Sequence, residues 1–191
     1  MGAILPLLTA YLSEHPMMAG GVVLVSVVLL VWLIWALKGH PVGFWFIFWG
    51  ELAERSSYYG MRTVLALYMT TVLGFEQNRG AKIMSFFMAA CYFMPLLGGI
   101  LADQVLGRYK TILIFSGPYI IGHLVLGGWE NETALFSALA LLALGAGAIK
   151  PNISTLMGEM YESQGKGDLL NKAFSYYYAA INVGSFISTF R

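Results

Sequence analysis

Long apolar stretches alternate along this chain with short polar connections. Six of the stretches are long enough, at about 1.5 Å per residue, to cross about 30 Å of hydrocarbon as helices. They cover approximately residues 21–37, 42–75, 81–101, 111–129, 133–161 and 169–190. This pattern predicts an all-α integral membrane protein whose second and fifth helices are longer than one crossing requires.

The composition agrees with a membrane protein. Of the 191 residues, 58% are hydrophobic and 11% are charged, and the mean hydropathy is +0.70. Soluble domains are about 25% charged. The formal net charge of +1 leaves no basic surface for nucleic acid. We therefore expect a multi-pass protein of the cell membrane whose surroundings are the lipid bilayer.

The sequence offers little for enzymatic or metal chemistry. Its one cysteine, Cys91, lies in an apolar run, and no Cys/His pair has the spacing of a metal site. No nucleophile elbow and no nucleotide-binding motif occurs. We expect no enzyme, no metal and no bound cofactor.

Charged residues interrupt the second apolar stretch. At about 100° per residue, one polar stripe within about 60° of a common direction is formed by Glu51, Glu54, Arg55, Tyr58 and Arg62. A charge near the bilayer centre costs at least about 2.5 to 3.5 kcal/mol. A structural ion-pair ladder would account for the stripe, but a proton or ligand site better explains why charges are tolerated at this depth.

Polar groups also occur in later stretches. Lys150 precedes Pro151 in the fifth stretch, where the proline frees a backbone carbonyl one turn back. In the sixth stretch, a stripe around Asn182 is explained equally well by hydrogen bonds between helices or by ligand contact. The lone His123 could relay protons, but a single histidine among Gly, Leu and Val is more often a packed residue that is hydrogen-bonded to backbone, and it is left out of the candidate site.

Three motifs resemble those of one family. They are Glu51-x-x-Glu54-Arg55 with Tyr58-Tyr59-Gly60, Lys150-Pro151-Asn152-x-Ser154, and Phe174-Ser175 with Ile181-Asn182-x-Gly184-Ser185. The first resembles the family motif ExxERFxYYG, with Ser56 where Phe is usual. On these residues the sequence resembles the N-terminal half of a proton-coupled oligopeptide transporter of the major facilitator superfamily.

The resemblance implies a proton-coupled symporter that imports di- and tripeptides across the cytoplasmic membrane by alternating access. It implies that protons, the coupling ion, are handled by Glu51, Glu54, Arg55 and Lys150. It implies that the peptide is bound by Tyr58, Tyr59, Arg62, Tyr92, Lys150 and Asn182. The peptide carboxylate needs fixed cations, and Arg62 and Lys150 can supply charge-assisted hydrogen bonds. Ser85 stands where some animal members carry a proton-linked histidine, so coupling would rest on the carboxylates and Lys150.

The resemblance covers residues 39–190 and corresponds to the family's first five helices. Residues 1–38 are expected to form an extra N-terminal hydrophobic helix. Residues 39–191 are expected to be an incomplete N-terminal bundle, with a C-terminal helix bundle in the full-length protein. Two other functions remain open at this point: proton-coupled transport of nitrate or another small anion, and a non-transporting, half-size membrane or assembly protein.

Overall fold

The chain divides into two compact units, Met1–His40 and Pro41–Arg191, and each is considered by itself. The computed structural model describes residues 20–21, 24, 27–28, 30–31 and 38–189. In the first unit, the described residues up to 31 are helical and residues 38–40 form a turn. The predicted helix 21–37 lies largely outside the described residues, so its membrane role stays a prediction.

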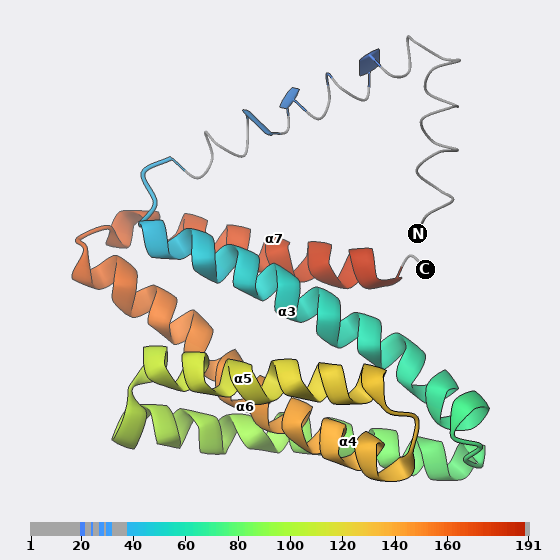
Figure 1. Cartoon of the computed structure of the whole chain (residues 1–191). Helices are drawn as coiled ribbons and strands as arrows, with labels where there is room; N and C mark the ends of the chain where they lie inside the picture. The colour runs from blue at the N-terminus through green and yellow to red at the C-terminus, as the bar shows by residue number, and fades with distance from the viewer. Residues whose placement is uncertain (1–19, 22–23, 25–26, 29, 32–37, 190–191) are drawn as a thin grey trace. The chain divides into compact units, whose positions relative to one another are not determined.

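The second unit is all-helical, as predicted (Figure 1). Its five α-helices are α3 (Val42–Leu67), α4 (Gln77–Leu101), α5 (Arg108–Gly128), α6 (Glu132–Ser163) and α7 (Leu170–Thr189). π-Helical turns extend α3 and α4, as η1 (Tyr68–Val72) and η2 (Ala102–Leu106), and a 3₁₀ turn, η3 (Gly167–Leu169), precedes α7. These bounds lie within a few residues of those that the apolar stretches predict.

Residues at the helix ends account for where several of the helices begin or end. Pro41 precedes α3, where its fixed φ suits a helix start and its missing N–H costs nothing. The side chain of Asn131 accepts a 2.8 Å hydrogen bond from the backbone N–H of Ala134, and so caps α6. Gly107 joins η2 to α5 at φ +77°, a conformation that favours glycine.

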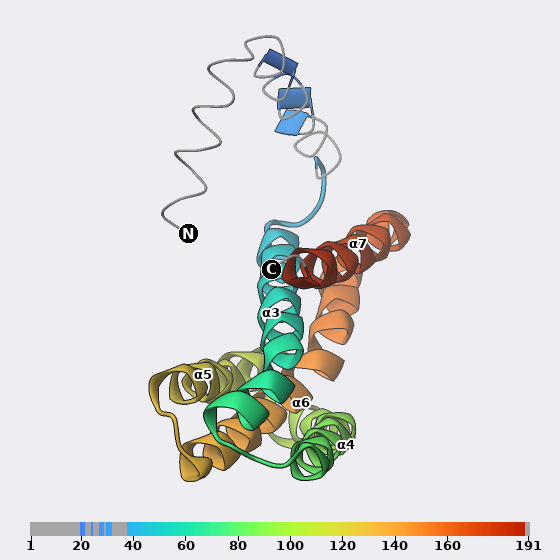
Figure 2. The ribbon, with the colours of Figure 1, turned by 90° about the vertical axis from the view of Figure 1, so that its right-hand side faces the viewer.

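α6 is the central helix of the second unit. It packs against α4 and α5, and α3 packs chiefly against α7. Figure 1 shows α3 between α7 above it and the group of α4, α5 and α6 below it, and Figure 2 shows the same helices turned by 90°. Glycines allow the closest approaches: a Cβ atom on Gly98 of α4 would lie 2.6 Å from Cα of Ala148 on α6. In a membrane, where lipid replaces water, such close backbone packing is a main source of helix association.

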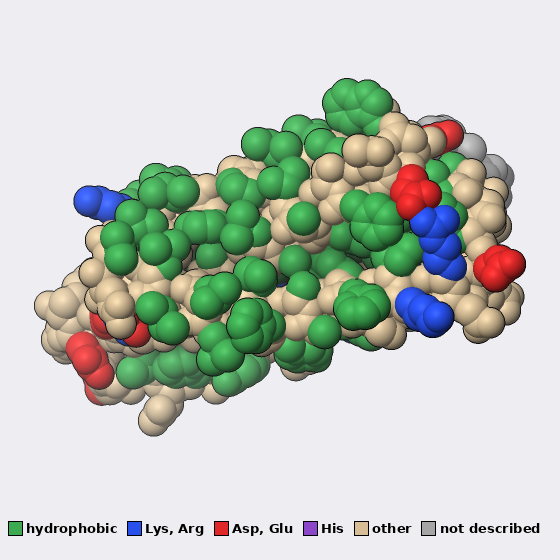
Figure 3. Space-filling model, turned by 90° about the horizontal axis from the view of Figure 1, so that it is seen from below, with side chains coloured by type: hydrophobic (Ala, Val, Ile, Leu, Met, Phe, Trp, Pro, Cys, Tyr) green, Lys and Arg blue, Asp and Glu red, His purple; other side chains and the backbone are tan. Residues whose placement is uncertain are grey.

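Three of the described helices are long and apolar enough to cross a membrane, judged by length and composition: α4 with η2, α5 and α6. α3 and α7 fall outside this group because of the polar stripes that the sequence predicts within them. Figure 3 shows one face of the molecule, on which hydrophobic side chains cover the middle and charged side chains gather towards the two ends. This distribution is what a membrane-spanning segment requires.

Candidate functional site

The charged stripe of α3 forms a buried cluster. Glu51 is 1% exposed and Glu54 is 8% exposed. Nε of Arg55 lies 2.5 Å from Oε1 of Glu51 and 3.2 Å from Oε2 of Glu54. One guanidinium therefore pairs with both carboxylates and leaves one net negative charge among the three groups. On α7, the buried phenol of Tyr177 lies against Glu51. The close contact between helices is possible because Gly184 of α7 faces the Cβ atom of Arg55.

Lys150 reaches the same region from α6. Its Nζ atom lies 3.9 Å from the centre of the Tyr58 ring, in a cation–π contact. Its charge also interacts with that of Glu54. Lys150 thus stands close to the carboxylates, while its nearest recorded partner is an aromatic face. A cation held in this way keeps its N–H donors available for another anion.

The turn of α3 that carries Glu54 also contacts α5. The hydroxyls of Ser57 and Tyr119 lie 3.0 Å apart, and the Tyr119 hydroxyl donates to the backbone carbonyl of Glu54 at 3.2 Å. The ring of Tyr119 packs edge-on against His123, with 4.8 Å between ring centres. Nε2 of His123 is buried and has no hydrogen-bond partner among the described residues. His123 is therefore packed, as predicted, but the backbone hydrogen bond expected for it is absent at Nε2.

A cavity of about 890 Å³ separates α3 from α5 beside this contact. Most of its lining is apolar, including Phe46, Ile120 and Ile153. Its polar lining includes Glu54 and Tyr119. The carboxylate cluster therefore borders this cavity on one side and contacts α7 on the other.

The residues predicted to bind a peptide are only partly brought together. Tyr58 is buried and stacks edge-on against the half-buried Tyr59, with 5.5 Å between ring centres. Arg62 and Tyr92 lie within electrostatic reach of Tyr58, but both are exposed, Tyr92 to 82%. Asn182 is exposed on α7, and the structure records no contact between its side chain and the cluster.

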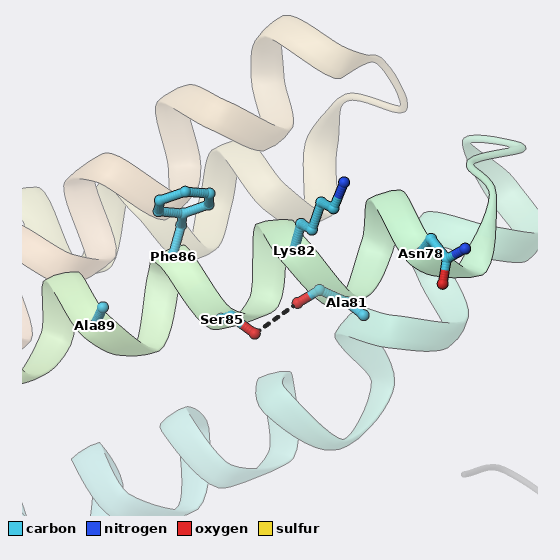
Figure 4. A pocket seen from close by; sticks show the side chains of 6 residues that line it. All are labelled: Asn78, Ala81, Lys82, Ser85, Phe86 and Ala89. Atoms are coloured by element: carbon cyan, nitrogen blue, oxygen red, sulfur yellow. Dashed lines mark hydrogen bonds between the residues drawn. The ribbon is translucent and has the colours of Figure 1, made fainter.

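Ser85 is an exposed residue of α4, about two turns before Tyr92. A hollow of about 630 Å³ is lined there by residues that include Lys82, Ser85 and Phe86. Figure 4 shows Lys82 and Phe86 projecting from the same side of the helix. The Ser85 hydroxyl donates a 2.9 Å hydrogen bond to the carbonyl of Ala81 within its own helix. Ser85 thus brings no ionisable group to this position, and the location of proton coupling stays a prediction.

Ion pairs hold both ends of the helix group. At one end, Arg108 lies 2.9 Å from Asp103 and 2.5 Å from Glu159, which connects the start of α5 with η2 and α6. At the other end, Arg79 of α4 pairs with Glu132 of α6. Both groups lie near helix ends, where partial exposure makes single pairs weak contributors to stability.

Sequence reasoning did not find several residues of the cluster. Ser57, Tyr119 and Tyr177 contact it, yet no motif or spacing marks them. Tyr119 lies on a helix that carries no charged stripe, and its role depends on how α5 and α3 approach each other. Only the three-dimensional arrangement could reveal these contacts.

Comparison with known proteins identifies the family. The sequence model of the POT family matches residues 109–191. Solute carrier family 15 member 1 of Rattus norvegicus is 40% identical over 169 residues, which cover 79% of this chain and 24% of that protein. Peptide transporter family 1 of Drosophila melanogaster is 39% identical over 157 residues, which cover 78% of this chain and 21% of that protein.

A solved structure agrees with these relatives. A mutant of the peptide transporter POT, in complex with alafosfalin, superposes with a TM-score of 0.75 at 36% identity and covers 79% of this chain and 32% of that one. The chain spans about a quarter of the length of the curated relatives that it matches. The match is to a family of membrane transporters and not to enzymes. This chain belongs to the proton-coupled oligopeptide transporter (POT) family.

Proposed function

We propose that this chain is part of a proton-coupled symporter that imports di- and tripeptides across the cell membrane by alternating access. The observation that carries the proposal is the buried group of two carboxylates, one arginine and one nearby lysine on helices α3 and α6. Burying this much charge within membrane helices costs free energy, and ionisable residues at such depth usually belong to a functional site. Relatives named as peptide transporters support the choice of solute.

The cluster suggests how protons and peptide are coupled. While both carboxylates are ionised, Arg55 is held between Glu51 and Glu54. Protonation of Glu54 removes one of these anions, so Arg55 keeps a single partner and Lys150 loses its nearby negative charge. Lys150 then attracts the carboxylate of a peptide more strongly, with Arg62 as a second cation. Because the proton and the peptide favour the same state, their binding is coupled through the conformational equilibrium.

The proposed peptide site is completed by exposed side chains. Tyr59, Arg62, Tyr92 and Asn182 all present at least part of their surface, and a zwitterionic ligand needs both fixed cations and aromatic or amide walls. An acidic group for the peptide's amino terminus is expected from a C-terminal helix bundle. In this proposal, the exposed faces of α4 and α7 line one half of the peptide-binding cavity, and the C-terminal bundle lines the other half.

The finer architecture is also a proposal. We assign the second unit to the N-terminal helix bundle of the major facilitator superfamily, family helices one to five, and residues 1–38 to an additional hydrophobic helix. The apolar cavity between α3, α5 and α6 supports this assignment. α6 is flanked by α4 and α5, whereas α3 is flanked chiefly by α7. A further helix of the complete bundle would cover the cavity beside α3.

Lys150→Ala tests the proposed coupling. In the complete transporter, reconstituted in liposomes, we expect this variant to abolish dipeptide uptake driven by an inward proton gradient. Exchange of labelled for unlabelled dipeptide without a gradient needs alternating access but no net proton movement. It should therefore persist at high peptide concentration, with a raised half-saturating concentration because Lys150 also binds the peptide carboxylate. Lys110→Ala is the matched control, since Lys110 is an exposed lysine near the start of α5, away from the cluster.

Two results would contradict the proposal. Undiminished gradient-driven uptake by Lys150→Ala would remove Lys150 from the coupling mechanism. Proton-driven uptake of nitrate by the wild type, without dipeptide uptake, would show that the solute is an anion and not a peptide.

A further inference from the structure

Tyr119 lies where α5 meets the coupling cluster, although no motif includes it. Its side chain is 7% exposed. Its hydroxyl oxygen lies 3.2 Å from the carbonyl oxygen of Glu54 and 3.0 Å from Oγ of Ser57, and Oγ of Ser57 donates to the same carbonyl at 2.9 Å. The three oxygens lie within hydrogen-bonding distance of one another at the turn of α3 that carries Glu54, and the two hydroxyl protons are shared among them.

The other side of Tyr119 rests on α6. A Cβ atom added to Gly145 would lie 2.6 Å from Cβ of Tyr119 and 2.9 Å from its backbone. The backbones of α5 and α6 are therefore in direct contact at this level. Lys150 lies five residues farther along α6, which is about 7.5 Å along a helix axis.

Tyr119 thus connects the two helices that carry the proposed coupling charges. Near this level α3 and α5 are otherwise separated by the cavity of about 890 Å³. The Tyr119 side chain crosses from the backbone contact with α6 to the Glu54 turn of α3. A shift of α3 relative to α6, which would change the separation of Glu54 and Lys150, must break or stretch these hydrogen bonds.

We propose that Tyr119, with Ser57, is a positioning residue for proton coupling: it fixes the Glu54 turn of α3 relative to Lys150 on α6. This inference rests on the proposed function.

Glu54 has several ionisable neighbours from the helices around it, namely Glu51, Arg55, Cys91, Tyr119, Lys150 and Tyr177. His123 lies against the ring of Tyr119 and lines the same cavity as Glu54. The separation of Glu54 from Lys150 is the quantity that Tyr119 controls.

Tyr119→Phe separates positioning from packing. The variant keeps the ring that packs against Gly145 and His123 and removes only the hydroxyl. If Tyr119 served packing alone, this variant would behave as wild type. If the hydroxyl positions Glu54, losing one buried hydrogen bond should lower proton-driven dipeptide uptake about three- to tenfold. It should also move the pH profile of uptake, because the charge balance around Glu54 changes.

The experiment compares wild type, Tyr119→Phe, Ser57→Ala and the double variant in the complete transporter, with dipeptide uptake measured across a range of external pH. Gradient-free exchange is measured in parallel and should stay at the wild-type level. The double variant should be little worse than Tyr119→Phe, since residues of one hydrogen-bonded group are not additive. Tyr109→Phe is the matched control, because Tyr109 is an exposed tyrosine of α5 that lines the same cavity.

The outcomes are distinct. If Tyr119→Phe takes up dipeptide at the wild-type rate and with the wild-type pH profile, the positioning role is overturned. An equal loss of exchange and of driven uptake would also overturn it, because that result indicates general disruption. Absence of driven dipeptide uptake in folded wild-type protein would overturn the proposed function and, with it, the coupling role of Tyr119.

Discussion

Gly98 of α4 lies against the backbone of α6, and Gly98→Ala is expected to destabilise the protein. The added Cβ atom would lie 2.6 Å from Cα of Ala148 and 2.7 Å from the carbonyl oxygen of Gly147. Ordinary contact begins at 3.4 Å, so the first distance is short by about 0.8 Å. Because both opposing atoms belong to the α6 backbone, a side-chain rotation cannot relieve the clash and the two helices must separate.

The neighbouring Gly99 provides the control. A Cβ atom on Gly99 would meet nothing within 4 Å. Both substitutions gain the same helix propensity, about 0.8 to 1.0 kcal/mol for Gly to Ala. The difference between the two variants therefore isolates the packing effect, which we expect to be about 1 to 3 kcal/mol, the usual cost of overpacking a tight interior.

Thermal unfolding of the complete transporter in detergent measures this difference. Gly98→Ala should lower the Tm by on the order of a few degrees relative to Gly99→Ala. The Gly99→Ala protein should be as stable as wild type or slightly more stable. Equal Tm values for the two variants would refute the close packing of α4 on α6 that underlies the geometry of the site.

Two further variants test contacts of the same helices. Asn152→Ala removes a buried amide that donates to the carbonyls of Gly98 at 3.2 Å and Ala148 at 2.7 Å, so a loss of about 1 to 3 kcal/mol in unfolding free energy is expected by thermal denaturation. A wild-type Tm would argue against these hydrogen bonds. Arg108→Gln removes the partly exposed ion pairs with Asp103 and Glu159 and should cost about 1 kcal/mol or less, with the difference from wild type shrinking as salt is raised. A large effect that is insensitive to salt would contradict this weak surface role.

The sequence predicts the helices of the second unit well because length and hydropathy dominate in a membrane. The charged stripe of α3 was predictable in the same way. Helical spacing places Glu51, Glu54, Arg55 and Tyr58 on one side, and the cost of charge in lipid requires that side to face protein. The structure buries all four of these side chains largely or fully.

Arg62 shows where helical spacing stops being sufficient. It shares the direction of Glu51, yet it is exposed. Near the described end of α7, Ser188 approaches Gly60, and Arg62 lies two residues farther along α3. The spacing of residues along one helix predicts the direction in which each side chain projects. It does not predict how much of that face a neighbouring helix covers.

The contacts between helices were not predictable from single-helix patterns. Lys150 was recognised as a charge in an apolar segment, but its position over the Tyr58 ring depends on how α6 crosses α3. The hydrogen bonds of Tyr119 depend likewise on the close contact of α5 with Gly145. Such details follow from helix packing, which a single sequence does not specify.

Proton-driven peptide import is measured by the uptake of a labelled dipeptide into liposomes that contain the complete transporter. We expect an inside-alkaline gradient to drive accumulation of the dipeptide, a proton ionophore to abolish this accumulation, and unlabelled di- and tripeptides to compete with it. Dipeptide uptake that does not depend on the proton gradient, or the absence of peptide uptake by folded protein, would contradict the proposed proton-coupled peptide import.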